Sequence, residues 1–217
     1  MEETIRQIAI FALPVLFAVV LHEVAHGWVA NRLGDPTAAR LGRLTLNPIS
    51  HVDIYGTILI PLFLVAVGAP FIFGYAKPVP VNFNNLRNPK RDMIWVAAAG
   101  PVTNIILAVA SGYMFKAVYA LENLLPDMLQ APLAMMADFS VKMNVMLAAF
   151  NLLPVPPLDG GRVLVGMAPQ PLSSIVARIE PFGFIIVLAL LMTHTLDFFL
   201  EPFVYLVLRL VQGLVIG

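Results

Sequence analysis

Long apolar stretches are the feature of this sequence that most constrains its fold. A bilayer core of about 30 Å is crossed by roughly 20 apolar residues in a helix. Stretches of this kind lie at residues 4–33, 54–76, 93–118, 132–153, 182–197 and 201–215. Only 12% of residues are charged, against about 25% in a soluble domain, so most of the surface must face lipid. We therefore predict an all-α polytopic membrane protein, a single domain over residues 1–217, with about five to six transmembrane helices.

The stretch 54–76 differs from the others because it contains Pro61, Gly68 and Pro70. Basic residues flank it on both sides, at Arg32, Arg40 and Arg43 before it and at Lys77, Arg87, Lys90 and Arg91 after it. The positive-inside rule places both flanks in the cytoplasm. This stretch should then enter the bilayer and return as a re-entrant hairpin, which is tolerated where protein buries it. A plain additional span with a basic outer loop is the alternative.

The lack of cysteine limits the chemistry that this sequence can perform. It excludes disulfides, thiolate metal ligands and a cysteine nucleophile. A metal site must therefore use carboxylates and the four histidines, which are His22, His26, His51 and His194. The formal net charge of +0 gives no indication of nucleic-acid binding.

The segment His22-Glu-Val-Ala-His26 lies inside the first apolar stretch. Residues four apart share one face of a helix, so both imidazoles can bind one Zn²⁺ while Glu23 takes a proton from water on the metal. A chance match is the alternative, but ionisable side chains within a spanning helix are costly and functional by default. His22 lies 18 residues past Thr4, about 27 Å along a helix, which places the site near the cytoplasmic end of the span.

Two residues are candidates for a third ligand, since catalytic zinc usually has three protein ligands. Asp159 lies between a proline-rich stretch and two glycines, on irregular backbone at the end of an apolar run. An Asp before Gly-Gly is also ordinary turn chemistry. His51 is the second candidate, and a hydrogen-bonded loop histidine is its other interpretation.

Two asparagines in the apolar stretches are candidates for supporting roles. Asn151 could donate to the oxyanion that develops from a scissile carbonyl, or it could cap the end of its helix. Asn104 follows Gly100-Pro101, a small residue and a kink, and should hydrogen-bond across helices beside the site. We also include Asn104 among the candidate substrate-contacting residues.

The segment Lys77-Pro78-Val79-Pro80 cannot be helical and its alternation suits a short β segment at the edge of a sheet. A substrate helix must be opened before its carbonyl can reach a metal. An edge strand could hold the opened substrate by β-augmentation, which makes these four residues candidates for substrate binding. A proline-stiffened loop is the alternative.

Taken together, these motifs resemble those of the site-2 protease family, the intramembrane zinc metalloproteases of peptidase M50. The resemblance rests on His22-Glu-x-x-His26, on Asn151-x-x-Pro154 and on Leu158-Asp159-Gly160. It extends to Gly100-Pro-Val-Thr-Asn104 and to the segment 74–81, and so covers nearly the whole chain. The spacing is similar to that of the short branch without PDZ or CBS domains.

The resemblance implies a role for each matching position. His22, His26 and Asp159 would hold one zinc per chain, Glu23 would be the general base, and Asn151 would hold the substrate or polarise its carbonyl. The substrate would be a transmembrane protein, cut in or next to its membrane segment. The enzyme would be an integral protein of a prokaryotic inner membrane with its site near the cytoplasmic face.

Three other functions use the same residues. A metal transporter or sensor could employ His22, His26 and Asp159, but it would not need Glu23 between the ligands. A catalytically silent scaffold would not need the complete polar set. Another membrane zinc hydrolase, such as a prenyl-protein protease, would take its further ligand from a different motif.

Overall fold

The fold was analysed in a computed structural model that describes residues 2–68, 74–193 and 195–216. Nine α-helices lie in these ranges: α1 (Glu2–Leu33), α2 (Thr37–Arg40), α3 (Ile60–Ala66), α4 (Pro89–Ala120), α5 (Asp127–Asn151), α6 (Asp159–Met167), α7 (Leu172–Ile179), α8 (Gly183–Met192) and α9 (Thr195–Ile216). A π-helical turn, Ile54–Leu59, leads into α3, and 3₁₀ turns cover Pro48–His51, Phe83–Asn85 and Glu180–Phe182.

Five helical segments in the described residues are long and apolar enough to cross a membrane. They are Ile10–Leu33, Pro89–Ala120, Met128–Asn151, Leu172–Met192 and Thr195–Val215. The prediction of an all-α polytopic membrane protein is therefore confirmed. The fourth segment begins before residue 182, where the sequence suggested a start. Pro181 lies in the first turn of the 3₁₀ segment, a position that proline tolerates, so it does not separate α7 from α8.

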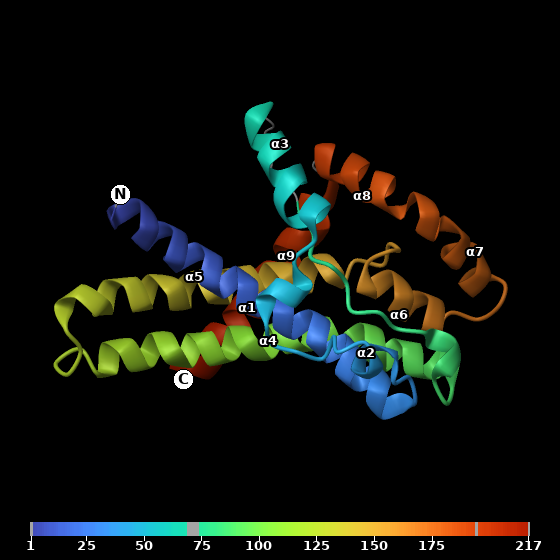
Figure 1. The fold of residues 1–217 in the computed structure, drawn as a ribbon, viewed down its shortest axis with the longest axis horizontal. Coiled ribbons are helices and arrows are strands. Elements are labelled where there is room, and N and C mark those ends of the chain that lie inside the picture. Colours follow the sequence, from blue (N-terminus) through green and yellow to red (C-terminus); the bar gives the residue numbers. More distant parts are fainter. Residues whose placement is uncertain (1, 69–73, 194, 217) are drawn as a thin grey trace.

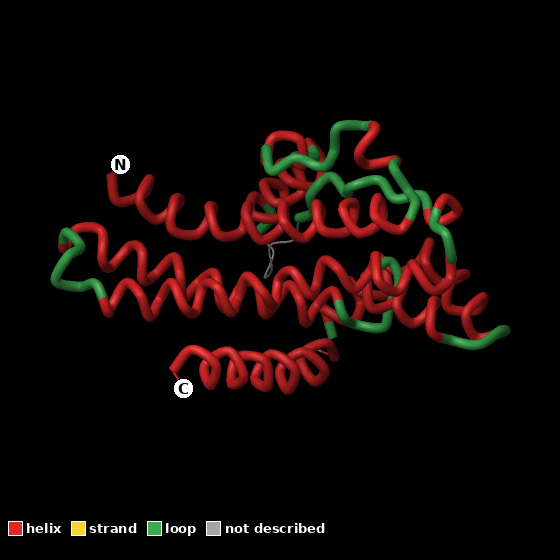
Figure 2. The backbone as a smooth tube through the Cα atoms, turned by 90° about the horizontal axis from the view of Figure 1, so that it is seen from below, coloured by secondary structure: helices red, strands yellow, loops and turns green. Residues whose placement is uncertain are grey.

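The helices form layers around a pair of antiparallel helices, α4 and α5 (Figure 1). Figure 2 shows the helix that begins at the N-terminus on one side of this pair and the helix that ends at the C-terminus on the other. The contacts agree, because both α1 and α9 pack on α4 and α5. Buried apolar side chains join α9 to the pair, at Ala108, Val145, Val207, Val211 and Val215. This packing leaves the inner face of α1 turned toward α4.

The segment that contains α3 leaves the bundle and returns to the place where it left. The backbone N–H of Tyr75 donates to the carbonyl of Gly56 at 3.0 Å, and the Thr57 hydroxyl donates to the carbonyl of Tyr75 at 2.9 Å. No residue of α3 is buried, and the helix projects from the body of the protein (Figure 1). Residues 69–73 of the expected hairpin lie outside the described residues.

The extended segment 74–82 forms no β ladder, and no strand occurs in the described parts of the chain. The predicted short β segment is therefore not confirmed. Its N–H groups pair elsewhere, since Lys77 donates to the carbonyl of His51 at 2.9 Å and Val79 donates to a carboxylate of α1. Pro78 and Pro80 have no N–H group to give. The segment is an extended loop held against α1.

Asp35 fastens the far end of this loop to the end of α1. Its buried carboxylate accepts hydrogen bonds from the backbone N–H of Asn82 at 2.7 Å, from the Asn85 amide at 2.9 Å, and from the N–H and hydroxyl of Thr37. Burial alone would raise the pKa of Asp35, but the hydrogen bonds from Thr37, Asn85 and Asn82 outweigh it and lower the pKa. The carboxylate is therefore held in its charged form.

Asp35→Asn should lower the melting temperature of the detergent-solubilised protein. The amide cannot accept from every donor, and each buried donor left unpaired costs about 1–3 kcal/mol. Because the folded pKa is below the ordinary value, the stabilisation is complete above about pH 4 and is lost as the pH falls through the folded pKa. Glu122→Gln, at an exposed turn, is the control and should melt like the wild type. Equal melting temperatures for both variants would contradict the anchoring role.

Candidate metal centre

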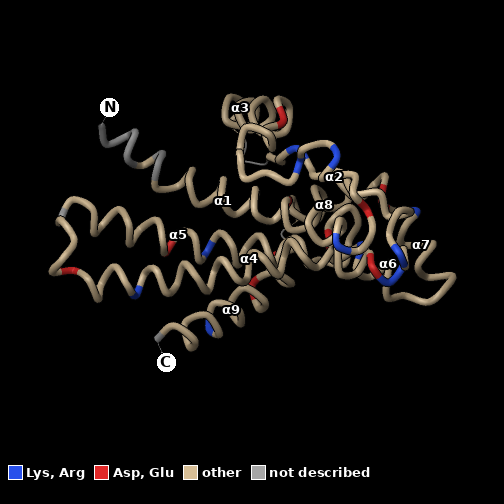
Figure 3. The backbone as a smooth tube through the Cα atoms, turned by 60° about the horizontal axis from the view of Figure 1, so that its bottom comes forward, with Lys and Arg blue, Asp and Glu red and all other residues tan. Residues whose placement is uncertain are grey.

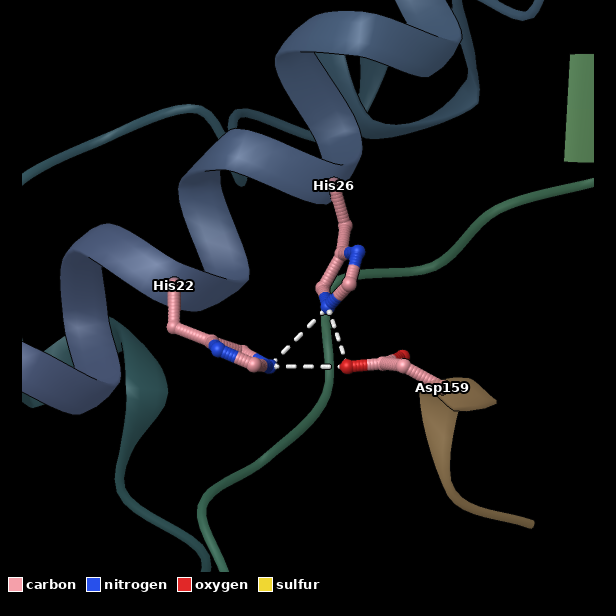
Figure 4. A group of neighbouring side chains, drawn as sticks. All are labelled: His22, His26 and Asp159. Carbon is pink, nitrogen blue, oxygen red and sulfur yellow. Dashed lines mark hydrogen bonds and ion pairs between the residues drawn. The ribbon is translucent and has the colours of Figure 1, made fainter. Parts of the chain in front are cut away.

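Two helices far apart in sequence bring three metal-binding side chains together. His22 and His26 lie one turn apart on α1, and Asp159 is the first residue of α6 (Figure 4). The two Nε2 atoms are 3.0 Å apart, and Oδ2 of Asp159 lies 3.2 Å from Nε2 of His22 and 3.3 Å from Nε2 of His26. Both His22 and Asp159 are buried. Three ligand atoms thus form a nearly equilateral triangle.

The dimensions and chemistry of this triangle fit zinc. Ligands held about 2.0–2.1 Å from a tetrahedral zinc lie about 3.3–3.4 Å from one another, close to the distances observed. Oδ2 of Asp159 is buried and has no hydrogen-bond partner, although buried carboxylate oxygens are normally paired. A cation between the three atoms would satisfy this oxygen and both imidazoles.

Hydrogen bonds on the other ring nitrogen orient each histidine. Nδ1 of His26 lies 2.7 Å from the carbonyl of Val96, and Nδ1 of His22 lies 2.6 Å from Oδ1 of Asn104. Both partners are oxygen acceptors, so each Nδ1 carries the proton and each Nε2 keeps its lone pair for a metal. Both contacts come from α4. The arrangement therefore leaves Nε2 of both histidines facing Asp159.

Gly100 lies directly against the two imidazoles. A methyl group at this position would overlap Nε2 of His26 and would lie 2.6 Å from Nε2 of His22. The sequence indicated only a small residue for close helix packing here. The structure gives a stricter reason, since any side chain at Gly100 would enter the space between the ligands.

Two further glycines allow Asp159 to reach the site. Methyl groups on Gly160 and Gly161 would overlap the backbone of Leu152 and Pro156. The first turn of α6 can therefore lie against the loop that follows α5. This close contact places the carboxylate of Asp159 opposite α1.

Glu23 lies beside the triangle and contacts the extended loop. Its Oε2 accepts the backbone N–H of Val79 at 2.8 Å. The Val79 side chain also packs on α1, because a methyl group on Gly27 would lie 2.6 Å from its Cγ1. The loop predicted to bind substrate is thus held against the carboxylate predicted to be the general base.

A cleft of about 500 Å³ opens beside these residues. Its walls come from α1, from the loop 74–83, from the end of α5 with Pro157 and Leu158, and from α8. His22, Glu23, His26 and Asp159 all line it, and Arg162, one turn past Asp159, lines it as well. A polypeptide entering the cleft would reach the three ligand atoms.

The remaining predicted site residues fall in different places. Asn151 lines the cleft, while its Nδ2 donates to the carbonyl of Leu147 at 2.9 Å, so it also caps its own helix. Pro78 and Val79 line the cleft, whereas Lys77 and Pro80 do not.

Asn104 and His51 lie away from the cleft. The fully buried Asn104 contacts His22 and does not line the cleft. His51 is buried and bonds through Nε2 to the carbonyl of Thr45, and it does not belong to the ligand group, so Asp159 is the better candidate for the third ligand.

The sequence did not single out Asn144 or the carbonyl of Val96. Asn144 is buried on α5 and its Oδ1 accepts the amide of Asn104 at 2.8 Å. A polar residue in an apolar spanning helix is a signal that could have identified it. The Val96 carbonyl carries no such signal, because every residue has one.

Gly100→Ala should weaken zinc binding by more than about tenfold, because the added methyl group displaces both imidazoles. Gly213→Ala is the matched control, since no atom lies within 4 Å of the added methyl group on α9. Chelator competition on the purified protein measures both affinities. Wild-type affinity in Gly100→Ala would contradict the geometry described above.

Comparison with known proteins identifies the family. The model of peptidase family M50 matches residues 10–193. The chain is 37% identical over 188 residues to "Putative zinc metalloprotease YwhC" of Bacillus subtilis (strain 168). The matched region covers 87% of this chain and 82% of that protein. It is 28% identical over 190 residues to "Putative zinc metalloprotease Rip2" of Mycolicibacterium smegmatis, covering 88% and 69% of the two chains. No solved structure matches the chain. The chain therefore belongs to peptidase family M50 and is a zinc metalloprotease.

Proposed function

We propose that this metalloprotease hydrolyses a peptide bond in or next to the transmembrane segment of another membrane protein. The observation that carries the proposal is the triangle of His22, His26 and Asp159 with Glu23 beside it, in a cleft between apolar helices. Ionisable groups are costly in such surroundings and are kept for function. A cleft in this position is open to a membrane-embedded polypeptide.

The proposed chemistry assigns one step to each residue. His22, His26 and Asp159 hold one zinc ion per chain, which when bound polarises a carbonyl and lowers the pKa of water. Glu23 takes a proton from the attacking water and returns it to the leaving amine. Asn151 donates an amide hydrogen to the developing oxyanion. The contact of Glu23 with the Val79 N–H orients the carboxylate for proton transfer.

We propose that the substrate binds in extended form along the loop Lys77-Pro78-Val79-Pro80. Lys77 and Val79 use their N–H groups on the protein side, and Pro78 and Pro80 have none. The carbonyls of Lys77 and Pro78 accept from the Arg43 guanidinium at 3.0 and 3.4 Å. The loop can therefore offer a substrate strand the carbonyls of Val79 and Pro80, which pair with N–H groups of an unwound helix.

The distribution of charge supports a proposal for the placement in the membrane. Lys and Arg gather at the end of the bundle near α2, α6 and α7 (Figure 3). The positive-inside rule assigns this end, which lies next to the metal centre, to the cytoplasm. We propose that the segment that contains α3 enters the bilayer and returns to the same side, since Tyr75 at its end is hydrogen-bonded to Gly56 at its start. The bacterial relatives favour the inner membrane of a prokaryotic cell.

Glu23→Gln tests the proposed reaction. It should keep zinc, because Glu23 is not in the ligand group, and lose cleavage of a model transmembrane substrate by about 10²–10⁴-fold. Metal content and cleavage are measured on the same purified protein, with Asp159→Ala as the variant expected to lose both. Cleavage at the wild-type rate would exclude Glu23 as the base, and a transporter or sensor would show no cleavage in any form.

Val79→Pro tests the contact between the loop and the base. Proline removes the N–H that reaches Glu23, so turnover should fall by on the order of tenfold while zinc content is unchanged. Val79→Ala keeps the N–H and should lose less turnover than Val79→Pro. An equal loss in both variants would show that side-chain packing, and not the N–H, is responsible.

A further inference from the structure

A row of buried, hydrogen-bonded amide side chains leads from the metal centre into the bundle. Oδ1 of Asn104 accepts from Nδ1 of His22 at 2.6 Å, and Nδ2 of Asn104 donates to Oδ1 of Asn144 at 2.8 Å. Nδ2 of Asn144 donates to the carbonyl of Ser140 at 2.9 Å. Asn104 has no exposed surface and Asn144 has 1%. This row of amides joins α1, α4 and α5 through one continuous set of hydrogen bonds.

Backbone carbonyls determine which atom donates and which accepts in every hydrogen bond of this row of amides. A carbonyl can only accept, so the carbonyl of Ser140 requires the NH₂ group of Asn144, whose oxygen must then face Asn104. The carbonyl of Ala18, 3.3 Å from Nδ2 of Asn104, imposes the same orientation. The oxygen of Asn104 therefore faces His22.

The orientation of Asn104 decides which nitrogen of His22 is protonated. With its oxygen toward His22, Asn104 requires the proton on Nδ1 and leaves Nε2 free. With the amide reversed, Nδ2 would donate to Nδ1 and the proton would move to Nε2, where it would block a metal. His26 faces no such choice, since its partner is the carbonyl of Val96.

We propose that Asn144 is a positioning residue for the metal centre, acting through Asn104 to hold His22 in its ligand tautomer. This inference rests on the proposed zinc site, and it assigns a function to a buried polar residue that lies two helix turns before Asn151. Asn144 does not line the cleft and takes no part in the proposed proton transfers. Its effect should appear in metal binding before any substrate is present.

The test is a double-mutant cycle on the full-length protein in detergent. Asn104→Leu and Asn144→Leu should each weaken zinc binding by about 10–100-fold, as loss of a group that orients a ligand does. The double variant should bind zinc no more weakly than Asn104→Leu alone, because Asn144 acts through Asn104. Asn123→Leu is the matched control, since Asn123 lies at an exposed turn after α4. Chelator competition gives the affinities, and the visible spectrum of the Co²⁺ form reports ligand geometry.

Wild-type zinc affinity in Asn144→Leu, or losses that add in the double variant, would overturn the proposal. A ¹⁵N NMR spectrum of the zinc-loaded wild type needs no variant, and it should show His22 protonated on Nδ1 and bound to the metal through Nε2. Protonation on Nε2 would also overturn the proposal. If the wild type binds zinc but cleaves no substrate, the proposed protease function is contradicted while the role of Asn144 is not. The two results can be told apart because the zinc affinities of the Asn variants are measured without substrate.

Discussion

The contact between α1 and α4 at Gly100 is the constraint on which the rest of the site depends. The imidazoles of His22 and His26 lie against a residue with no side chain. At this distance α4 can also provide the hydrogen-bond partners of both Nδ1 atoms, Asn104 and the carbonyl of Val96. One helix contact therefore decides the position and the tautomer of two ligands together. Asp159 completes the set from α6, where two glycines permit a similarly close approach to the loop after α5.

The polar groups inside this apolar protein form a connected set with few unpaired atoms. An isolated polar group in a bilayer costs several kcal/mol by order of magnitude, and the amides of Asn104 and Asn144 are fully paired. Oδ2 of Asp159 is one of three buried side-chain atoms in the described parts of the chain that have no hydrogen-bond partner, with Nε of Arg43 and Nδ1 of His51, and it faces the two imidazoles. In the proposed function, the unpaired oxygen and the paired amides both serve the same metal site.

The loop 74–82 links the candidate metal centre to the end of α1 and to the segment before α3. Its middle touches Glu23 through the Val79 N–H, and its far end is fastened to α1 through Asp35. Its near end is joined to Gly56, where the excursion through α3 begins. The loop therefore connects the start of the α3 segment with the carboxylate of Glu23. The expected β strand is unnecessary for this, because loops and side chains of the protein already pair the inner side of the segment.

The sequence by itself determined the membrane-embedded helical fold, the His-Glu-His face of α1 and the candidacy of Asp159. The first two depend on composition and on spacing within one helix, and the third on the Pro-rich and Gly-Gly flanks of Asp159, all of which local residue patterns express directly. Only the tertiary structure places Asp159, and not His51, beside His22 and His26, puts Asn104 in contact with His22, and brings in Asn144, the Val96 carbonyl and the Val79 N–H. Each of those contacts joins residues at least 40 positions apart, and two of them use backbone groups that every residue has. Spacing along the chain cannot reveal them, because they exist only once α1, α4 and α5 are packed.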